Sequence, residues 1–202
     1  WMTDLAIHNP GDAPVTFGLE LLEWDQENGN PQTLTYTLEP GQSVGHADVL
    51  RWVFGVDSGA GTIRVSVEDG GAVLATARTY NLLPRGGSYG QFIPPHPPEA
   101  GIAGGDEGRL IHLAHAAEPS TGFRTNLGLV DIGPTDVFVD LDLWAGDGSP
   151  LGKLRAGLRA GESVQINNIL AGFASVAPET AFAVVRPAAA GSRVLSYASV
   201  ID

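Results

Sequence analysis

The stretch VFVDLDL, residues 137–143, decides the fold class. Its apolar residues stand at every second position, which is the period of a β-strand with one buried face. A second stretch with the same alternation, VTFGLEL at residues 15–21, lies 122 positions earlier. Two half-buried strands at such a fixed distance indicate an internal repeat.

Further blocks recur in the same order, with a shift of 120 to 122 positions. They are residues 3–7 (TDLAI) with 125–129 (TNLGL), 40–44 (PGQSV) with 160–164 (AGESV), and 73–77 (VLATA) with 194–198 (VLSYA). The shift changes only across polar stretches, where loops tolerate insertions. We therefore expect two copies of one domain, at residues 1–83 and 108–202, joined by a Pro/Gly-rich linker at residues 84–107.

Composition agrees with a chain of short strands. The 202 residues include 27 Gly and 14 Pro, which interrupt helices and so exclude a long helical bundle or a coiled coil. Each copy has short apolar runs separated by turn signals such as residues 9–11 (NPG) and 146–149 (GDGS). This pattern predicts an all-β fold of two tandem immunoglobulin-like β-sandwich domains.

The two copies differ at one edge. Copy two has a strand-like segment, residues 109–114 (RLIHLA), before its aromatic Phe123, whereas copy one begins at its aromatic Trp1. Copy one is therefore expected to lack its first strand. A sandwich without that strand presents unpaired backbone groups, to which another segment can be added as a strand.

Charge and cysteine usage restrict the partners. Eleven Lys and Arg against 23 Asp and Glu give a net charge of −12, which disfavours nucleic acid and anionic membranes. The chain has no Cys, hence no disulfide, thiolate nucleophile or zinc-thiolate site. No run approaches the roughly 20 apolar residues of a membrane-spanning helix, and Met2 behind Trp1 suggests a processed or excised piece of a longer chain.

Residues 41–45 (GQSVG) match the G-x-S-x-G pattern of a hydrolase nucleophile. That pattern acts at a strained turn from strand to helix, with a later His as base. Here it enters another strand, and copy two has Gln165 at the position of the last Gly. We expect a structural turn, no catalytic residue and no enzyme, and a hydrolase based on Ser43 is the weakest hypothesis.

Metal and cofactor sites are not expected. The two closest histidines, His112 and His115, would lie on opposite faces of a strand. Asp140 and Asp142 share a strand face with Asp147 in the turn beyond it, but calcium normally takes six to eight oxygen ligands. A solvated polar face is the favoured interpretation, and calcium binding by these three acids is left open.

Large aromatic residues form the candidate interaction surface. These residues are Trp1, Trp24, Phe92 and Trp144. Trp144 alternates with an inward-facing set and should point outward, where an exposed ring serves protein contact. Flat aromatic faces also bind sugars, so a carbohydrate-binding module of a secreted enzyme is the alternative function, with a glycan as partner.

Five segments of the chain form a set that is found in known proteins. They are residues 1–5 (WMTDL), 9–11 (NPG), 40–43 (PGQS), 78–81 (RTYN) and 89–94 (YGQFIP). Together they resemble the tandem immunoglobulin-like β-sandwich modules of large secreted or surface-exposed bacterial proteins. In that group an Ala-His strand usually precedes an aromatic-Arg-Thr-Asp segment. Copy two keeps Ala114-His115, whereas copy one lacks them and has Met2 in place of Arg.

The resemblance covers nearly the whole chain and implies an extracellular or cell-surface, non-enzymatic module. With the incomplete edge of copy one, it leads us to expect protein partners. These would be copies of the chain arranged head to tail in a fibre, or adjacent domains of a longer parent.

Overall fold

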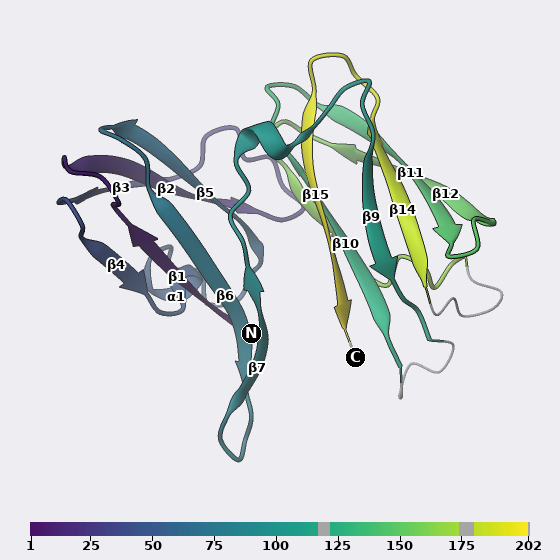
Figure 1. The fold of residues 1–202 in the computed structure, drawn as a ribbon, viewed down its shortest axis with the longest axis horizontal. Helices are drawn as coiled ribbons and strands as arrows, with labels where there is room; N and C mark the ends of the chain where they lie inside the picture. The colour runs from purple at the N-terminus through teal and green to yellow at the C-terminus, as the bar shows by residue number, and fades with distance from the viewer. Residues whose placement is uncertain (117–121, 174–179, 202) are drawn as a thin grey trace. The chain divides into compact units, whose positions relative to one another are not determined.

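The structure is a computed structural model that describes residues 1–116, 122–173 and 180–201. Its regular secondary structure is almost entirely β-strand, in four antiparallel sheets (Figure 1), which confirms the all-β class expected from the alternating stretches. Helical structure in the described part is limited to α1 (Val49–Trp52) and the 3-10 helix η1 (Pro98–Ala100). Of these, no helix is long and apolar enough to cross a membrane.

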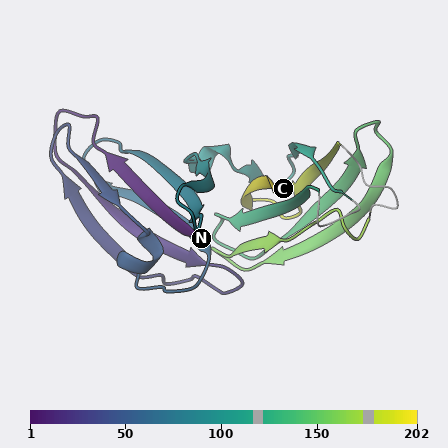
Figure 2. The same ribbon diagram turned by 90° about the horizontal axis from the view of Figure 1, so that it is seen from below.

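The chain divides into two compact units. The first unit comprises Trp1–Glu23 and Asn30–His96, and the second comprises Trp24–Gly29 and Pro97–Asp202. The chain thus leaves the first unit within the Pro-rich run at residues 94–98, where proline favours extended backbone. Figure 2 gives another view of the strands, those of the first unit in purple to teal and those of the second in teal to yellow.

Two sheets form the first unit, with the strand orders β4-β1-β6-β7 and β3-β2-β5. The strands are β1 (Met2–His8), β2 (Val15–Glu23), β3 (Thr33–Leu38), β4 (Ser43–His46), β5 (Gly61–Asp69), β6 (Leu74–Leu82) and β7 (Ser88–Ile93). Leu5 and Ile7 from one sheet pack with Phe17 and Leu19 from the other in a shared core. Alternate residues of β1 and β2 therefore face this core, as the sequence pattern predicts.

The second unit repeats this arrangement with the orders β13-β10-β15-β8 and β12-β11-β14-β9. Its strands are β8 (Ile102–Ala103), β9 (Gly108–Leu113), β10 (Arg124–Asp131), β11 (Val137–Ala145), β12 (Pro150–Leu158), β13 (Ser163–Ile166), β14 (Ala181–Pro187) and β15 (Arg193–Ile201). The decisive stretch, residues 137–143, lies in β11, and Val137, Val139, Leu141 and Leu143 are all buried in the core. β11 and β2 are central strands of corresponding sheets.

The stretch expected as a linker contains regular structure. Strand β7 pairs along its whole length with β6, from Ala77 opposite Ile93 to Leu82 opposite Ser88. Gly86 and Gly87 form the connecting turn with positive φ angles of 90° and 89°, a region that glycine enters without strain. Residues 102–103 form the short β8, which pairs with β15. The Pro/Gly composition of this stretch thus reflects turns as well as a connection.

Candidate interaction edge of the first unit

The sheets that contain β5 and β14 differ by one strand. In the second unit, β9 lies antiparallel to β14 at the edge of a four-stranded sheet. In the first unit, the corresponding sheet ends at β5, which among the described residues pairs only with β2. We call the unpaired side of β5 the open edge. The absence of a counterpart of β9 is the difference that residues 109–114 predict.

The side chains of β5 are more exposed than those of β14, as expected where a neighbouring strand is absent. Ile63 and Val65 of β5 face Leu21 and Leu19 across the pair with β2 but are only half-buried, and Val67 is 42% exposed. In β14, the equivalent Ala183 and Val185 are 0% exposed. The cover over β14 includes Leu110 and Leu113 of β9, which pack against the core of the second unit. The open edge therefore leaves apolar side chains of the first core accessible to solvent.

A pair of threonines marks the same difference. In the second unit, Thr125 Oγ1 accepts a hydrogen bond from Ala114 N at 2.9 Å and donates one to Ala114 O at 2.8 Å. Thr125 thereby holds the segment that follows β9. Its counterpart Thr3 bonds to the hydroxyl of Thr79 at 2.9 Å instead. The first unit keeps the threonine but lacks the backbone that it would hold.

The two units also share a backbone conformation in the loop after β4 and in the equivalent loop after β13. Asp48 has a φ of 43° and its N–H donates to Asp4 Oδ1 at 3.0 Å. Asn168 has a φ of 49° and its N–H donates to Asn126 Oδ1, also at 3.0 Å. In the second unit, the Asn168 side chain is hydrogen-bonded to His115, with 3.1 Å between Oδ1 and Nδ1. Asp48 makes no side-chain capping hydrogen bond.

Of the four aromatic residues expected to form an interaction surface, Trp1 and Phe92 belong to the first unit. Trp1 is 67% exposed and meets Tyr89 edge to face, with 5.4 Å between ring centroids. Phe92 lies on the outer face of β7, opposite Arg78 of β6, and lines a shallow depression of about 390 Å³ with Arg78 and Asp4. Trp1 stands four residues before the buried Leu5, so the alternation of β1 puts Trp1 on the same face of that sheet as Leu5.

Trp24 and Trp144 belong to the second unit. Trp144 stacks against Phe182, its partner across β11 and β14, with ring planes at 8° and centroids 6.2 Å apart. Both rings point outward from the core, as expected for Trp144, but each covers part of the other. Trp24 is half-buried and forms an isolated bridge with Ser163. Within the second unit, Trp24 contacts β13 and Trp144 lies in β11 of the other sheet, so these two residues do not form one surface.

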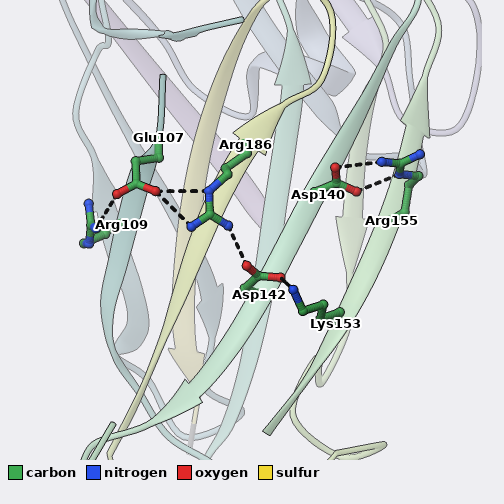
Figure 3. Close-up of polar contacts among 7 residues, drawn as sticks. All are labelled: Glu107, Arg109, Asp140, Asp142, Lys153, Arg155 and Arg186. Atoms are coloured by element: carbon green, nitrogen blue, oxygen red, sulfur yellow. Dashed lines mark hydrogen bonds and ion pairs between the residues drawn. The ribbon is translucent and has the colours of Figure 1, made fainter. Parts of the chain in front are cut away.

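The acidic residues considered for calcium are held by cations and by a turn (Figure 3). Arg155 binds both oxygens of Asp140, at 2.6 and 2.7 Å, and this hydrogen bonding holds the pKa of Asp140 below its usual value. Burial raises the pKa of Asp142, but ion pairs with Arg186 and Lys153, at 2.5 and 3.2 Å, outweigh burial and lower it. Asp147 accepts hydrogen bonds from Ser149.

Arg186 also contacts Glu107 at 2.9 Å, and Glu107 pairs with Arg109. A chain of ion pairs thus crosses β9, β14, β11 and β12 on the outer face of the sheet (Figure 3). Within the described residues, no group of three or more His, Cys, Asp or Glu side chains could hold a metal ion. In this arrangement the carboxylates of Asp140 and Asp142 are paired with cations, and that of Asp147 is bonded within its own turn.

Ser43 lies at the start of β4 and has a histidine neighbour. Its Oγ is 2.9 Å from His8 Nδ1, across the pairing of β1 with β4. The turn before it is formed by Gly41, whose φ is 71°, and leads from strand to strand rather than into a helix. In the described part of the chain, no carboxylate hydrogen-bonds to the His8 ring. The pair has neither the elbow nor the orienting acid of a hydrolase.

No family model and no curated protein matches this chain.

Proposed function

We propose that the chain is a non-enzymatic, extracellular interaction module, built of tandem immunoglobulin-like β-sandwiches, that binds a protein partner by strand addition at the open edge. The observation that carries this proposal is that the sheet β3-β2-β5 has three strands, whereas its counterpart β12-β11-β14-β9 in the second unit has four. Backbone N–H and C=O groups on a free edge are a template for an added strand.

The side chains at the open edge support the proposal. Natural edge strands are commonly protected by inward-pointing charges or proline, whereas the inward positions of β5 are Ile63, Val65 and Val67. An added strand would bury these residues as β9 buries the equivalent part of β14. Each fully buried aliphatic side chain contributes about 1.5–3 kcal/mol relative to an exposed one.

Head-to-tail association of copies is the form of partnership that we propose, as in a surface fibre. An edge on one unit that pairs with a different surface of the next copy makes a heterologous contact, and such contacts extend into filaments when they do not close. Adjacent domains of a longer surface protein would use the same edge. The net charge of −12 disfavours nucleic acid as the partner.

Light scattering over a range of protein concentrations, with electron microscopy of the assembled sample, tests this proposal. We expect association that is lost in Val67→Lys, which places a charge on the inward side of β5, and retained in the control Ser66→Lys, whose side chain lies on the outward side. Circular dichroism should show that both variants fold. A chain that stays monomeric at every concentration would contradict head-to-tail association.

Amide hydrogen exchange identifies the contact. On association, the amides of residues 61–69 should become protected, whereas those of β14, already covered on both sides, should not change. Association without any protection of β5 would show that another surface is used.

A further inference from the structure

The second unit contains a template for the strand that would fill the open edge. The inward residues of β9 are Gly108, Leu110 and Leu113, opposite Val185, Ala183 and Ala181. Two residues, rather than one, separate the leucines because the strand has a bulge: His112 has a φ of 63°, and the register shifts at this point. Ile111 between them is 74% exposed. The pattern is therefore Gly-x-Leu-x-x-Leu.

The template continues past the strand. Ala114 follows Leu113 and is held by both hydrogen bonds of Thr125, and His115 then meets Asn168. These contacts fix the residues Ala-His after the second leucine at defined positions relative to β14. A segment that satisfies all of them reads Gly-x-Leu-x-x-Leu-Ala-His, as residues 108–115 do.

The first unit keeps each receptor for this segment. Gly61, Ile63 and Val65 stand at the positions of Ala181, Ala183 and Val185. Thr3 stands at the position of Thr125. Asp48 stands at the position of Asn168, whose side chain is hydrogen-bonded to His115. Asp48 has the same left-handed backbone conformation as Asn168, and its backbone N–H makes the equivalent hydrogen bond. A histidine placed there would meet a carboxylate instead of an amide, and a charge-assisted hydrogen bond is stronger than a neutral one.

We propose that the open edge selects an extended peptide of the pattern Gly-x-Leu-x-x-Leu-Ala-His, bound antiparallel to β5 in the register that β9 has on β14. In this register the glycine lies opposite Val65, the first leucine opposite Ile63 and the second leucine opposite Gly61. The alanine backbone binds the Thr3 hydroxyl, and the histidine binds the Asp48 carboxylate. This inference rests on strand addition at the open edge and names the occupant that such addition requires.

Pairing of β5 with β5 of a second copy satisfies fewer of these contacts. Ile63, Val65 and Val67 alternate on one face of β5, and the register irregularity of this strand lies beyond them, between Val67 and Asp69. No two of these apolar residues therefore have the two-residue spacing of the leucines. It also offers no Ala-His step beyond its end for Thr3 and Asp48. In such pairing, β5 of a second copy would occupy the open edge instead of the proposed peptide, and the experiment below distinguishes these two occupants.

The probe is a synthetic peptide of residues 106–116, DEGRLIHLAHA, titrated into the full chain by calorimetry. We expect binding together with protection of the amides of residues 61–69. A peptide with both Leu110 and Leu113 replaced by lysine is the matched control and should not bind. Protection confined to residues 181–187 would mean that the peptide only exchanges with β9, and would overturn the inference.

Variants of the chain test the receptors one at a time. Thr3→Val removes the hydroxyl and should weaken binding about tenfold, the effect of one or two lost hydrogen bonds. Asp48→Asn should retain most of the affinity because Asn168 serves this role in the second unit. Asp48→Asn should also remove any preference for the native peptide over one with His115→Gln. Equal binding of the peptide by Thr3→Val and by the unaltered chain would contradict the register.

A second arm raises the effective concentration of the donor. A copy of residues 106–122, placed directly before Trp1 of the full chain, puts the donor where the second unit has it relative to Phe123, and tethering supplies millimolar effective concentrations. We expect a higher unfolding temperature of the first unit and protected β5 amides. The same graft with both leucines changed to lysine should have neither effect.

The outcomes distinguish the inference from the function on which it rests. If β5 becomes protected on self-association but neither the peptide nor the graft protects it, the pattern is wrong and strand addition stands. If β5 is protected under none of these conditions, both are wrong.

Discussion

Asp131 of the second unit stands at the position of Asn9 in the first unit. The Asn9 amide can both donate and accept hydrogen bonds with the surrounding backbone, whereas a carboxylate at this position can only accept them. Both accept a hydrogen bond on Oδ1 from a glycine N–H two residues later, at 2.9 Å. Asn9 Nδ2 then donates to the carbonyls of Ala13, Leu38 and Glu39. Asp131 is fully buried, and its Oδ2 has no partner among the described residues. Burial raises the pKa of Asp131.

Asp131→Asn should therefore stabilise the second unit at neutral pH, by about 1–3 kcal/mol, the cost of an unsatisfied buried polar group. In the unaltered chain, the folded state binds a proton on the Asp131 carboxyl more tightly than the unfolded state does, because burial raises the pKa of Asp131. The free energy of unfolding therefore falls as the pH rises from the usual pKa of an aspartate to this raised pKa. Urea unfolding across pH measures both effects. A variant with the same stability and the same pH dependence as the unaltered chain would contradict the assignment.

Thr125→Val should destabilise the second unit by about 1–3 kcal/mol, because it leaves the N–H and C=O of Ala114 without their shared partner. The matched control is Thr3→Val, which breaks a single bond between hydroxyls and should cost less. Thermal unfolding followed by circular dichroism compares the two. Equal losses would mean that the Thr125 hydroxyl does not hold the segment after β9.

Gly128→Ala should destabilise the chain by more than about 1 kcal/mol, the lower range for overpacking. A Cβ at Gly128 would overlap the ring of Tyr197, its partner across β10 and β15, and Tyr197 is further fixed by a hydrogen bond to Gln165 at 3.1 Å. Gly45→Ala is the control in the corresponding sheet, because a Cβ there meets nothing within 4 Å. Denaturant unfolding should separate the two variants.

Arg186→Gln should lower stability by less than about 1 kcal/mol, as ion pairs near the surface do, and the loss should shrink in high salt. Arg186 joins Asp142 to Glu107 and so links β9 to the rest of its sheet. Hydrogen exchange should rise at β9 more than at β12. Arg155→Gln, which leaves Arg186 in place, should not loosen β9, and an effect of equal size there would contradict the link.

Much of this architecture could be predicted from local pattern. Residues 137–143, in which apolar residues alternate, lie in β11. The first unit lacks a counterpart of residues 109–114, and its corresponding sheet has three strands instead of four. Pattern works here because inward residues of a half-buried strand must be apolar at every second position. The strand within the expected linker was harder to predict, because β7 depends on pairing with β6 as well as on its own residues.

The candidate site could be predicted only in part. Size and aromaticity selected Trp24 and Trp144, but Trp144 finds its stacking partner Phe182 through strand pairing that sequence distance hides. Thr3 and Asp48 carry no signal by themselves, since isolated Thr and Asp are common in turns and strands. Their significance comes from the contacts of Thr125 and Asn168 in the second unit.

The position of β1 between β4 and β6 also sets the order in which the first unit can form. Strand β1 pairs with residues 43–46 on one side and with residues 74–80 on the other. During synthesis the chain emerges at about 5–20 residues per second. Strand β6 therefore emerges several seconds after Leu5 and Ile7 of β1, and β1 lacks this neighbouring strand until then. Sheets built from such distant pairings fold slowly, in milliseconds to seconds. The first unit therefore passes through a stage in which β1 and β2 are both open to other chains, when high local concentration favours misassembly between copies.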